Sequence, residues 1–324
     1  MFTIKKLRKK NKVQIKSIKI GNVEVPNNVF LAPLAGYSSP EMRVVCTNLG
    51  AGLAFTEMVS AKGLKYNPKA TNELLYTYPE EKIKAVQLFG DDSEVLAWAA
   101  KSEYLQKFDI IDINMGCPVP KIFNNGEGSA LLKDIHKASK IIESVAKCGK
   151  PVTVKFRIGI EEGKFITKDF AKMCEDSGAS LITIHGRVRT AIYSGDVNFL
   201  EIESAKNAVK IPVIANGGVF CEEDANILME RTGADGVMVA RGAMNNPLIF
   251  SEITKSESSL SFKEAVLMHL NLLEKRIGSE RCAVIFRKQM AFYLKGVRDS
   301  KKLKEKAFSA TSASEMRDII LNYV

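Results

Sequence analysis

The sequence predicts an α/β protein: a (β/α)8 barrel of the TIM-barrel type, followed by a small C-terminal helical bundle. The first observation is that short apolar runs alternate with stretches of helical periodicity. The second is that the pattern after residue 255 is wholly helical. A barrel of this kind typically needs ~250 residues, and the chain has 324. The expected strands are 29–33, 53–59, 84–89, 110–114, 152–157, 181–185, 213–216 and 237–240.

Two segments between the strands show the expected helical spacing, because small or apolar residues recur at steps of three and four. One stripe is formed by Val95, Trp98, Ala99, Ser102 and Leu105, and the other by Ala138, Ile141, Ile142 and Val145. The alternative fold, a doubly wound open sheet, would usually show Gly-x-Gly-x-x-Gly after its first strand. The turn at 32–36 reads Ala-Pro-Leu-Ala-Gly and lacks it.

The charge is unevenly distributed over three expected segments. Residues 1–22, a basic N-terminal extension, hold eight Lys/Arg and no acidic residue. Residues 23–254 hold 25 Lys/Arg against 29 Asp/Glu, and residues 255–324 hold 14 against 8. Basic ends on an acidic body favour a polyanionic partner. A tail that only aids solubility is an equally good interpretation of the tail alone.

The two ends of the chain carry further local signals. Residues 13–25 alternate and contain Gly21-Asn22, which predicts a hairpin over the barrel floor. After a polar linker at 255–259, Ser261 and Glu264 have the spacing of a capping box, and Ser312 and Glu315 repeat it.

Composition excludes several classes. Hydrophobic residues make up 46% and charged residues 26%, as in ordinary globular proteins. No apolar run approaches the ~18 residues of a membrane span, and the N-terminus lacks the apolar core of a secretory signal. The six cysteines form no Cys-x-x-Cys pair, so we expect neither a zinc site nor a disulfide frame. A cytoplasmic location fits best.

Polar residues stand at the ends of the predicted strands, where barrel enzymes place their working groups. Burying such groups without partners costs roughly 1–3 kcal/mol each, so together they predict a large polar ligand. The strand-end residues are Pro33, Glu57, Gln87, Asn114, Lys155, His185, Asn216 and Arg241.

The last two strands end in Asn216-Gly217-Gly218 and Ala240-Arg241-Gly242. Loops in these positions are the usual phosphate site of such barrels. The glycines could serve tight turns alone, but with Arg241 and His185 nearby phosphate binding is the favoured interpretation. Lys155 would then stabilise negative charge on a cofactor or substrate, unless it only extends to the solvent at the rim.

Cys117 stands on a bend outside its strand, between Gly116 and Pro118. As a nucleophile it would need a lowered pKa and a nearby base. As an acid it need only face the carbon that receives a proton. The sequence does not separate these roles. A metal-ligand role has no companion residues at suitable spacing.

The motifs together resemble bacterial tRNA-dihydrouridine synthases, closest to the B-type members, from about residue 23 to the C-terminus. The most specific part is Asn114-Met115-Gly116-Cys117-Pro118 followed by Gly-Ser-Ala-Leu-Leu at 128–132. The further matches are Ala-Pro-Leu-Ala-Gly at 32–36, Val-Lys-Phe-Arg-Ile-Gly at 154–159, Ile-His-Gly-Arg at 184–187, the two glycine loops above, and Arg287-Lys288 with Tyr293-Leu294-Lys295-Gly296.

The resemblance implies an FMN enzyme that uses NADPH to reduce the C5–C6 bond of uridines in tRNA, with residues 23–254 as the catalytic domain and 255–324 as the tRNA-binding domain. It further implies a cytoplasmic monomer that needs neither metal nor membrane. Cys117 matches the acid that protonates C5, and Asn114 lies near flavin and uracil. The implied cofactor contacts are Pro33, Leu34, Ala35, Gln87, Lys155, His185, Asn216, Gly217, Gly218, Ala240 and Arg241, and the implied RNA contacts are Arg287, Lys288 and Lys295.

Some positions depart from the family pattern. Leu34 replaces a usual Met, Glu127 stands where a small residue is common, and residues 37–40 read Tyr-Ser-Ser-Pro. Two other functions stay open. A barrel enzyme acting on a free pyrimidine, like dihydroorotate dehydrogenase, would explain the cofactor residues but not the basic tail. A non-catalytic RNA-binding protein would explain the charge but not Cys117, Lys155 and His185.

Overall fold

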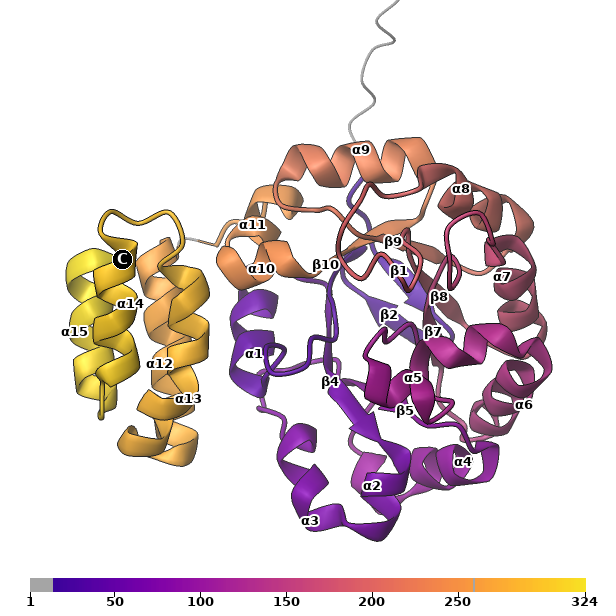
Figure 1. The fold of residues 1–324 in the computed structure, drawn as a ribbon, viewed down its shortest axis with the longest axis horizontal. Coiled ribbons are helices and arrows are strands. Elements are labelled where there is room, and N and C mark those ends of the chain that lie inside the picture. Colours follow the sequence, from indigo (N-terminus) through magenta and orange to yellow (C-terminus); the bar gives the residue numbers. More distant parts are fainter. Residues whose placement is uncertain (1–13, 259) are drawn as a thin grey trace, which may run out of the picture.

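The computed structural model describes residues 14–258 and 260–324; residues 1–13, which include most of the basic extension, and residue 259 lie outside it. Within the described residues, eight parallel strands close into a barrel in the order β10-β3-β4-β5-β6-β7-β8-β9. Figure 1 shows the strands at the centre of a ring of helices. The predicted barrel is thereby confirmed. Its strands are β3 (Val29–Leu31), β4 (Leu53–Ser60), β5 (Ala85–Phe89), β6 (Ile110–Met115), β7 (Val152–Arg157), β8 (Leu181–His185), β9 (Val213–Asn216) and β10 (Gly236–Val239).

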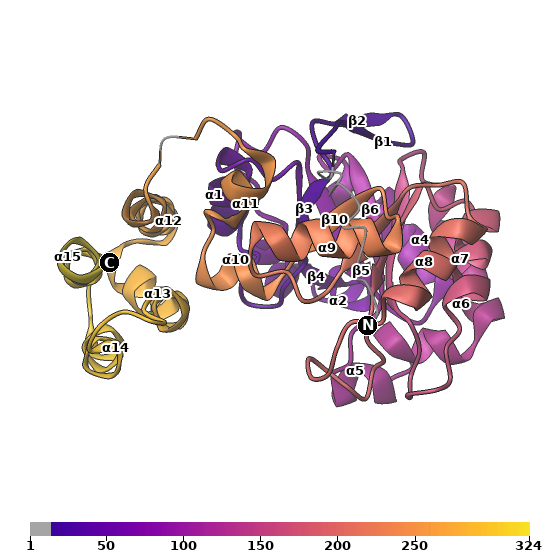
Figure 2. The same ribbon diagram turned by 90° about the horizontal axis from the view of Figure 1, so that it is seen from above.

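Helices surround the strands (Figure 2). They are α1 (Pro40–Asn48), α2 (Ala61–Tyr66), α3 (Pro68–Thr71), α4 (Ser93–Lys101), α5 (Pro120–Asn124), α6 (Ile135–Ala146), α7 (Thr167–Asp176), α8 (Phe199–Ala208), α9 (Glu222–Thr232), α10 (Arg241–Asn245) and α11 (Ile249–Thr254). The longer ones, such as α6 and α7, bury apolar residues in the barrel core. Short 3-10 turns occur at η1 (Asn72–Leu75), η2 (Glu103–Leu105) and η3 (Gly128–Lys133).

The two predicted helix faces differ in outcome. The whole stripe of α6 is fully buried, as predicted. In α4, Val95 and Ala99 are buried, but Trp98 is 38% exposed and Leu96 takes its place in the core. The Nζ atom of Lys65 lies 5.7 Å from the Trp98 ring centroid. A cation over an aromatic face offsets part of the cost of exposing the ring, so the apolar stripe of α4 is narrower than its sequence suggests.

An antiparallel hairpin closes the N-terminal end of the barrel. It consists of β1 (Ile18–Ile20) and β2 (Val23–Val25). Gly21 in its turn has φ +57°, a conformation that glycine adopts without steric cost. Ile18, Ile20 and Val25 pack against inward-facing residues near the starts of the barrel strands, such as Phe30. The opposite end of the barrel, where the strands finish, is left for the site.

The C-terminal residues form a helical bundle with a core of its own. Its elements are α12 (Phe262–Ile277), α13 (Ser279–Tyr293), α14 (Ser300–Ser309) and α15 (Ala313–Tyr323). The capping box of Ser261 and Glu264 forms in both directions. At the second site Ser312 accepts a bond from the Glu315 N–H, but the Glu315 carboxylate binds the backbone and hydroxyl of Thr311 instead. The second box is therefore only half formed, because Thr311 offers two donors.

The bundle packs beside α1 and α10 (Figure 1). Arg276 Nε lies 2.6 Å from Oε1 of Glu41, which is fully buried. The Tyr78 hydroxyl donates to the Leu272 carbonyl at 2.9 Å. These bonds join α12 to the barrel. Among the residues that the structure describes, no helix is both long and apolar enough to cross a membrane.

Candidate active site

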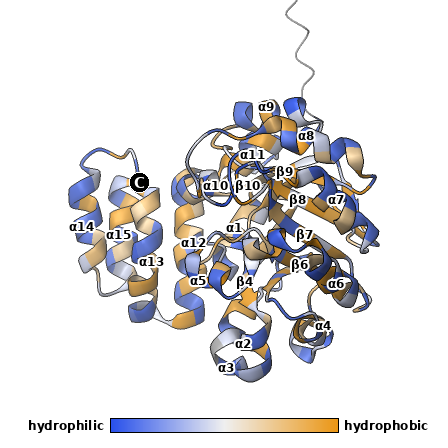
Figure 3. Cartoon of the chain, turned by 45° about the vertical axis from the view of Figure 1, so that its right-hand side comes forward, coloured by the Kyte–Doolittle hydropathy of each residue, from blue (hydrophilic) through white to orange (hydrophobic). Residues whose placement is uncertain are grey.

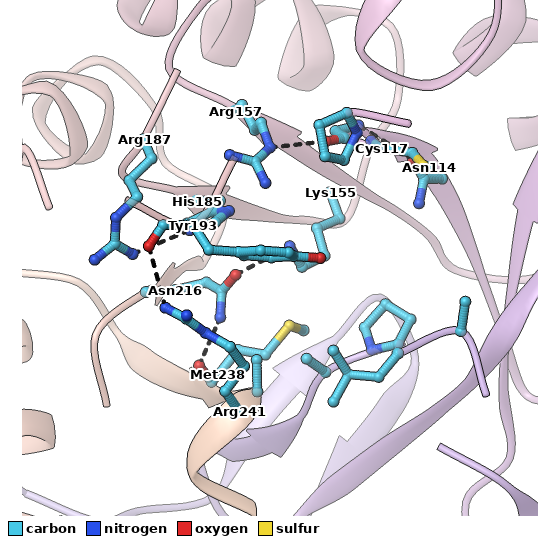
Figure 4. Close-up of a pocket in the computed structure, with 18 of the residues that line it drawn as sticks. Asn114, Cys117, Lys155, Arg157, His185, Arg187, Tyr193, Asn216, Met238 and Arg241 are labelled. Carbon is cyan, nitrogen blue, oxygen red and sulfur yellow. Dashed lines mark hydrogen bonds between the residues drawn. The ribbon is translucent and has the colours of Figure 1, made fainter. Parts of the chain in front are cut away.

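The C-terminal end of the barrel contains one pocket that brings the predicted site residues together (Figure 4). Its lining includes Pro33, Leu34, Ala35, Gln87, Asn114, Cys117, Lys155, His185, Asn216, Gly217, Gly218, Ala240 and Arg241. Glu57 instead accepts a bond from the Gly36 N–H and lines a second cavity, between barrel and bundle.

Several lining residues were not found from the sequence. Arg157 and Arg187 follow Lys155 and His185 by two positions. Residues two apart on a strand point to the same side, so this spacing was a usable signal for Arg157. Tyr193 and Phe220 come from loops and had no such signal. Met58 and Met238 complete the apolar part of the wall.

Four hydrogen bonds to side chains fix the backbone around Cys117. The N–H groups of Cys117 and Gly116 donate to Oδ1 of Asn114, at 2.9 and 3.2 Å. Ser129 Oγ donates to the Cys117 carbonyl at 2.7 Å, and Arg157 Nε donates to the Gly116 carbonyl at 2.9 Å. The bend that follows β6 is thus tied to β7 and to η3, and it places the thiol at the pocket wall.

Two features keep Cys117 close-packed and protonated. Gly128 has φ +60°, and a Cβ there would lie 2.9 Å from the Cys117 Cβ, so only glycine fits. Burial raises the pKa of the Cys117 thiol, although the Val119 backbone N–H and the charges of Arg157 and Lys155 act in the opposite direction. The group is therefore a thiol at neutral pH, with its proton available.

Lys155 is held in the pocket by an amide. Its Nζ donates to Asn216 Oδ1 at 3.0 Å, and Asn216 Nδ2 donates to the Met238 carbonyl at 2.8 Å. Burial, assisted by the nearby Arg157, lowers the pKa of Lys155 to about 8. The ammonium is charged at neutral pH, and a negative group placed beside it would be stabilised.

The opposite end of the pocket is cationic and lined by glycine. Arg187 Nη1 lies 3.4 Å from His185 Nε2, and Arg241 Nη2 donates to the Tyr193 carbonyl at 3.4 Å. Burial, and then the surrounding cations, hold the pKa of His185 well below its usual value, so its ring is neutral. Gly217 has φ +124°, and a Cβ there would lie 3.0 Å from His185 Cδ2. Guanidinium groups beside open backbone have the chemistry that an anion would need.

A protonated thiol and a lysine at the mouth of a (β/α)8 barrel, next to two arginines, stand where enzymes of this fold class place their working residues. Comparison with known proteins identifies the family. The model of the dihydrouridine synthase (Dus) family matches residues 30–322. The chain belongs to this family, and it is a dihydrouridine-forming oxidoreductase.

Relatives agree over nearly the whole chain. The protein named tRNA-dihydrouridine synthase B from Pasteurella multocida is 35% identical over 303 residues, which cover 90% of this chain and 91% of that protein. Its namesake from Vibrio parahaemolyticus is 33% identical over 310 residues, covering 93% and 96%. A histamine dehydrogenase structure from Rhizobium sp. 4-9 shares the fold, with a TM-score of 0.58 and 13% identity over 79% of this chain and 50% of that one.

Proposed function

We propose that this protein reduces the C5–C6 bond of specific uridines in tRNA to 5,6-dihydrouridine, with FMN as cofactor, NADPH as reductant and Cys117 as general acid. The observation that carries the proposal is the position of the thiol, which is kept protonated by burial and shares a pocket with Lys155 and an anion-binding end. The names of the relatives, which act on tRNA, support the substrate.

The pocket residues fit a flavin mononucleotide. The guanidinium of Arg241 and the open backbone of Gly217 and Gly218 suit a terminal phosphate. The apolar wall at Pro33 and Leu34 suits a flat ring, and the remaining contacts proposed for the cofactor are Ala35, Gln87, Lys155, His185, Asn216 and Ala240. When bound and reduced by NADPH, the flavin would supply the hydride that uracil receives at C6.

Cys117 would supply the proton at C5. A raised pKa favours this role over a nucleophilic one, which needs a thiolate at neutral pH. Asn114 holds the backbone of the bend through its Oδ1 atom, so the thiol stays at one place in the wall. Lys155 would hold negative charge close to the reacting rings.

A barrel mouth admits a uracil only when the base is turned out of its stack. We propose that residues 23–254 perform the chemistry and that residues 255–324, with their excess of basic residues, hold the tRNA backbone. Lys295 is exposed, and Lys288 Nζ lies 4.1 Å from the Tyr37 ring centroid near the mouth. Arg287 donates to the Ala310 carbonyl at 2.7 Å, so it also holds the bundle together.

We propose that the protein acts as a monomer. We propose that this monomer acts in the cytoplasm, where tRNA is the polyanion available to its basic tail.

The test uses purified protein. Its cofactor is released and identified as FMN or another flavin, and NADPH oxidation is then followed with added tRNA, with free orotate and with free uridine. We expect FMN, and turnover that yields dihydrouridine with tRNA alone. Turnover with orotate would favour the free-pyrimidine enzyme, and RNA binding without any bound flavin would favour a non-catalytic protein.

A further inference from the structure

A line of buried polar side chains runs behind the pocket, across three strands, to the Cys117 bend. Thr153 Oγ1 donates to Asp112 Oδ1 at 2.5 Å, and Gln87 Nε2 donates to Asp112 Oδ2 at 2.6 Å. Asn114 Nδ2 then donates to Gln87 Oε1 at 2.8 Å, and Asn114 Oδ1 accepts from the Cys117 N–H. Asp112 is 1% exposed, and unlike Gln87 and Asn114 it does not line the pocket.

The hydrogen bonds that lead from Asp112 through Gln87 and Asn114 to the Cys117 bend form a relay. The direction of every bond in this relay is fixed from both ends. At one end the backbone N–H groups of Gly116 and Cys117 can only donate, so Asn114 must turn its oxygen toward them. Its Nδ2 group then faces Gln87, which must present its own oxygen. Gln87 Nε2 is left facing Asp112, where an acceptor is required. A carboxylate is such an acceptor.

We propose that Asp112 is a positioning residue that, as a hydrogen-bond acceptor, fixes the amide orientations of Gln87 and Asn114 and thereby holds the Cys117 bend. Each amide keeps one further N–H beyond the relay, and that of Asn114 lies toward Met58 Sδ at 3.9 Å. In this orientation the amide edge of the pocket offers donors and not carbonyl oxygens. It would therefore recognise the acceptor atoms of a heterocyclic ring, a consequence that rests on the proposed function.

The relay needs an acceptor, and it does not need a negative charge. Burial raises the pKa of Asp112 to about 7, against the bonds from Thr153 and Gln87, so the relay operates close to the pH at which this group is neutralised. Asparagine can replace it, because Oδ1 accepts from Gln87 Nε2 while Nδ2 donates to the Thr153 hydroxyl. Leucine, of similar volume, cannot accept. Asp112→Asn keeps the acceptor and removes the charge, whereas Asp112→Leu removes both. Together the two variants show which of these properties the relay needs.

The experiment measures how fast iodoacetamide alkylates Cys117 in the flavin-free full-length protein, by peptide mass spectrometry, with the exposed Cys221 as internal reference. It uses no flavin, NADPH or tRNA, so its result is independent of the proposed function. Asp112→Leu should speed alkylation of Cys117 about tenfold, the size expected for one buried polar group left unpaired. Asp112→Asn should stay within about twofold of the native rate.

Two further variants sharpen the test. Thr153→Val removes a bond from the same cluster but leaves Gln87 an acceptor; it should lower the melting temperature and leave the alkylation rate unchanged. Gln87→Met interrupts the relay nearer the thiol and should match Asp112→Leu, and the double variant should add nothing, because both act on one relay. If Asp112→Leu does not fold, Gln87→Met replaces it.

The activity of the same folded variants, loaded with flavin, completes the comparison: rescue by Asp112→Asn and loss with Asp112→Leu are expected in single-turnover reduction of tRNA. The proposal is overturned if Asp112→Asn exposes Cys117 as much as Asp112→Leu does, since charge would then be the property that matters. It is also overturned if neither Asp112→Leu nor Gln87→Met changes the alkylation rate. If the alkylation rates of the variants are as predicted but the wild-type protein does not reduce tRNA, the result counts against the proposed function and not against the relay.

Discussion

Burial acts on Cys117 and Lys155 in the same physical way, by disfavouring the charged form, with opposite chemical results. The thiol becomes a weaker acid and keeps its proton. The ammonium becomes a stronger acid, with a pKa of about 8, and still carries its charge at neutral pH. A single buried pocket therefore offers a proton donor and a cation side by side.

Replacing Cys117 tests the proton donor. Cys117→Ala should leave flavin binding and flavin reduction by NADPH intact, because neither step uses the thiol. Uridine reduction should fall by roughly 10²–10⁴, the usual contribution of a positioned general acid. Single-turnover kinetics of the two half-reactions separate these effects. Normal uridine reduction by the variant would rule out Cys117 as the acid.

Lys155 predicts a pH dependence. Its folded-state pKa of about 8 means that the ammonium is charged below pH 8 and neutral above it. FMN affinity should therefore change little from pH 7, where the FMN phosphate is already almost fully charged, to pH 7.5. It should decline as the pH rises through 8, with a shift upward if the bound anion stabilises the ammonium. Fluorescence titration of flavin-free protein measures this. Lys155→Met should bind FMN more weakly and lose the decline; an unchanged profile would remove Lys155 from the cofactor site.

At the level of elements, the loop after β9 owes its shape to glycine. Gly217→Ala forces a side chain into φ +124° and puts a Cβ 3.0 Å from His185 Cδ2, so we expect FMN affinity to fall at least tenfold as the phosphate hydrogen bonds are weakened. Gly163→Ala is the control, since it has φ +77° but nothing within 4 Å of the added Cβ. It should cost stability only. Equal FMN affinity in both variants would contradict the phosphate assignment.

The sequence predicted elements where one periodicity dominates, and failed where tertiary contacts decide. The barrel strands and the buried face of α6 follow from apolar runs and steps of three and four. Its spacing puts Trp98 on the apolar face of α4. The spacing cannot show that Lys65, from another helix, lies over the ring of Trp98 and leaves it partly exposed. The second capping box is only half formed for a similar reason, because the Glu315 carboxylate accepts its bonds from Thr311 and not from the Ser312 N–H.

The same distinction applies to the pocket. Strand ends converge in any barrel, so the residues at these ends could be predicted to lie together. Glu57 is the exception, because its carboxylate accepts a bond from the Gly36 N–H and lines the cavity between barrel and bundle. Tyr193 and Phe220 come from loops whose paths depend on the whole fold. Asp112 was visible in the sequence, but its role emerges only from its hydrogen bonds.

At the level of the whole molecule, an acidic barrel carries a basic bundle. The barrel strands are largely hydrophobic and α14 is largely hydrophilic (Figure 3). The lysines Lys301 and Lys302 on α14 are exposed, as is Lys295 before it. They can therefore be changed without the loss of packing that would accompany changes at Arg287 or Lys288, which contact Ala310 and Tyr37.

Changing Lys295, Lys301 and Lys302 to Ala should weaken tRNA binding and flatten its salt dependence, by about 0.7–0.9 in the log–log slope for each phosphate that the variant no longer neutralises. The melting temperature and NADPH oxidation without tRNA should not change. The matched control removes three exposed lysines from α4, α6 and the end of α6: Lys101, Lys140 and Lys147. Equal slopes for the two triple variants would show that the bundle surface is not the RNA site.

The most direct test of the central claim is mass spectrometry of tRNA nucleosides. Unmodified tRNA is incubated with the flavin-loaded protein and NADPH, digested and mapped. We predict a two-hydrogen mass increment at one or a few defined uridines, absent with Cys117→Ala and absent from free uridine. No increment at any position, from protein that retains its flavin and oxidises NADPH, would contradict the account.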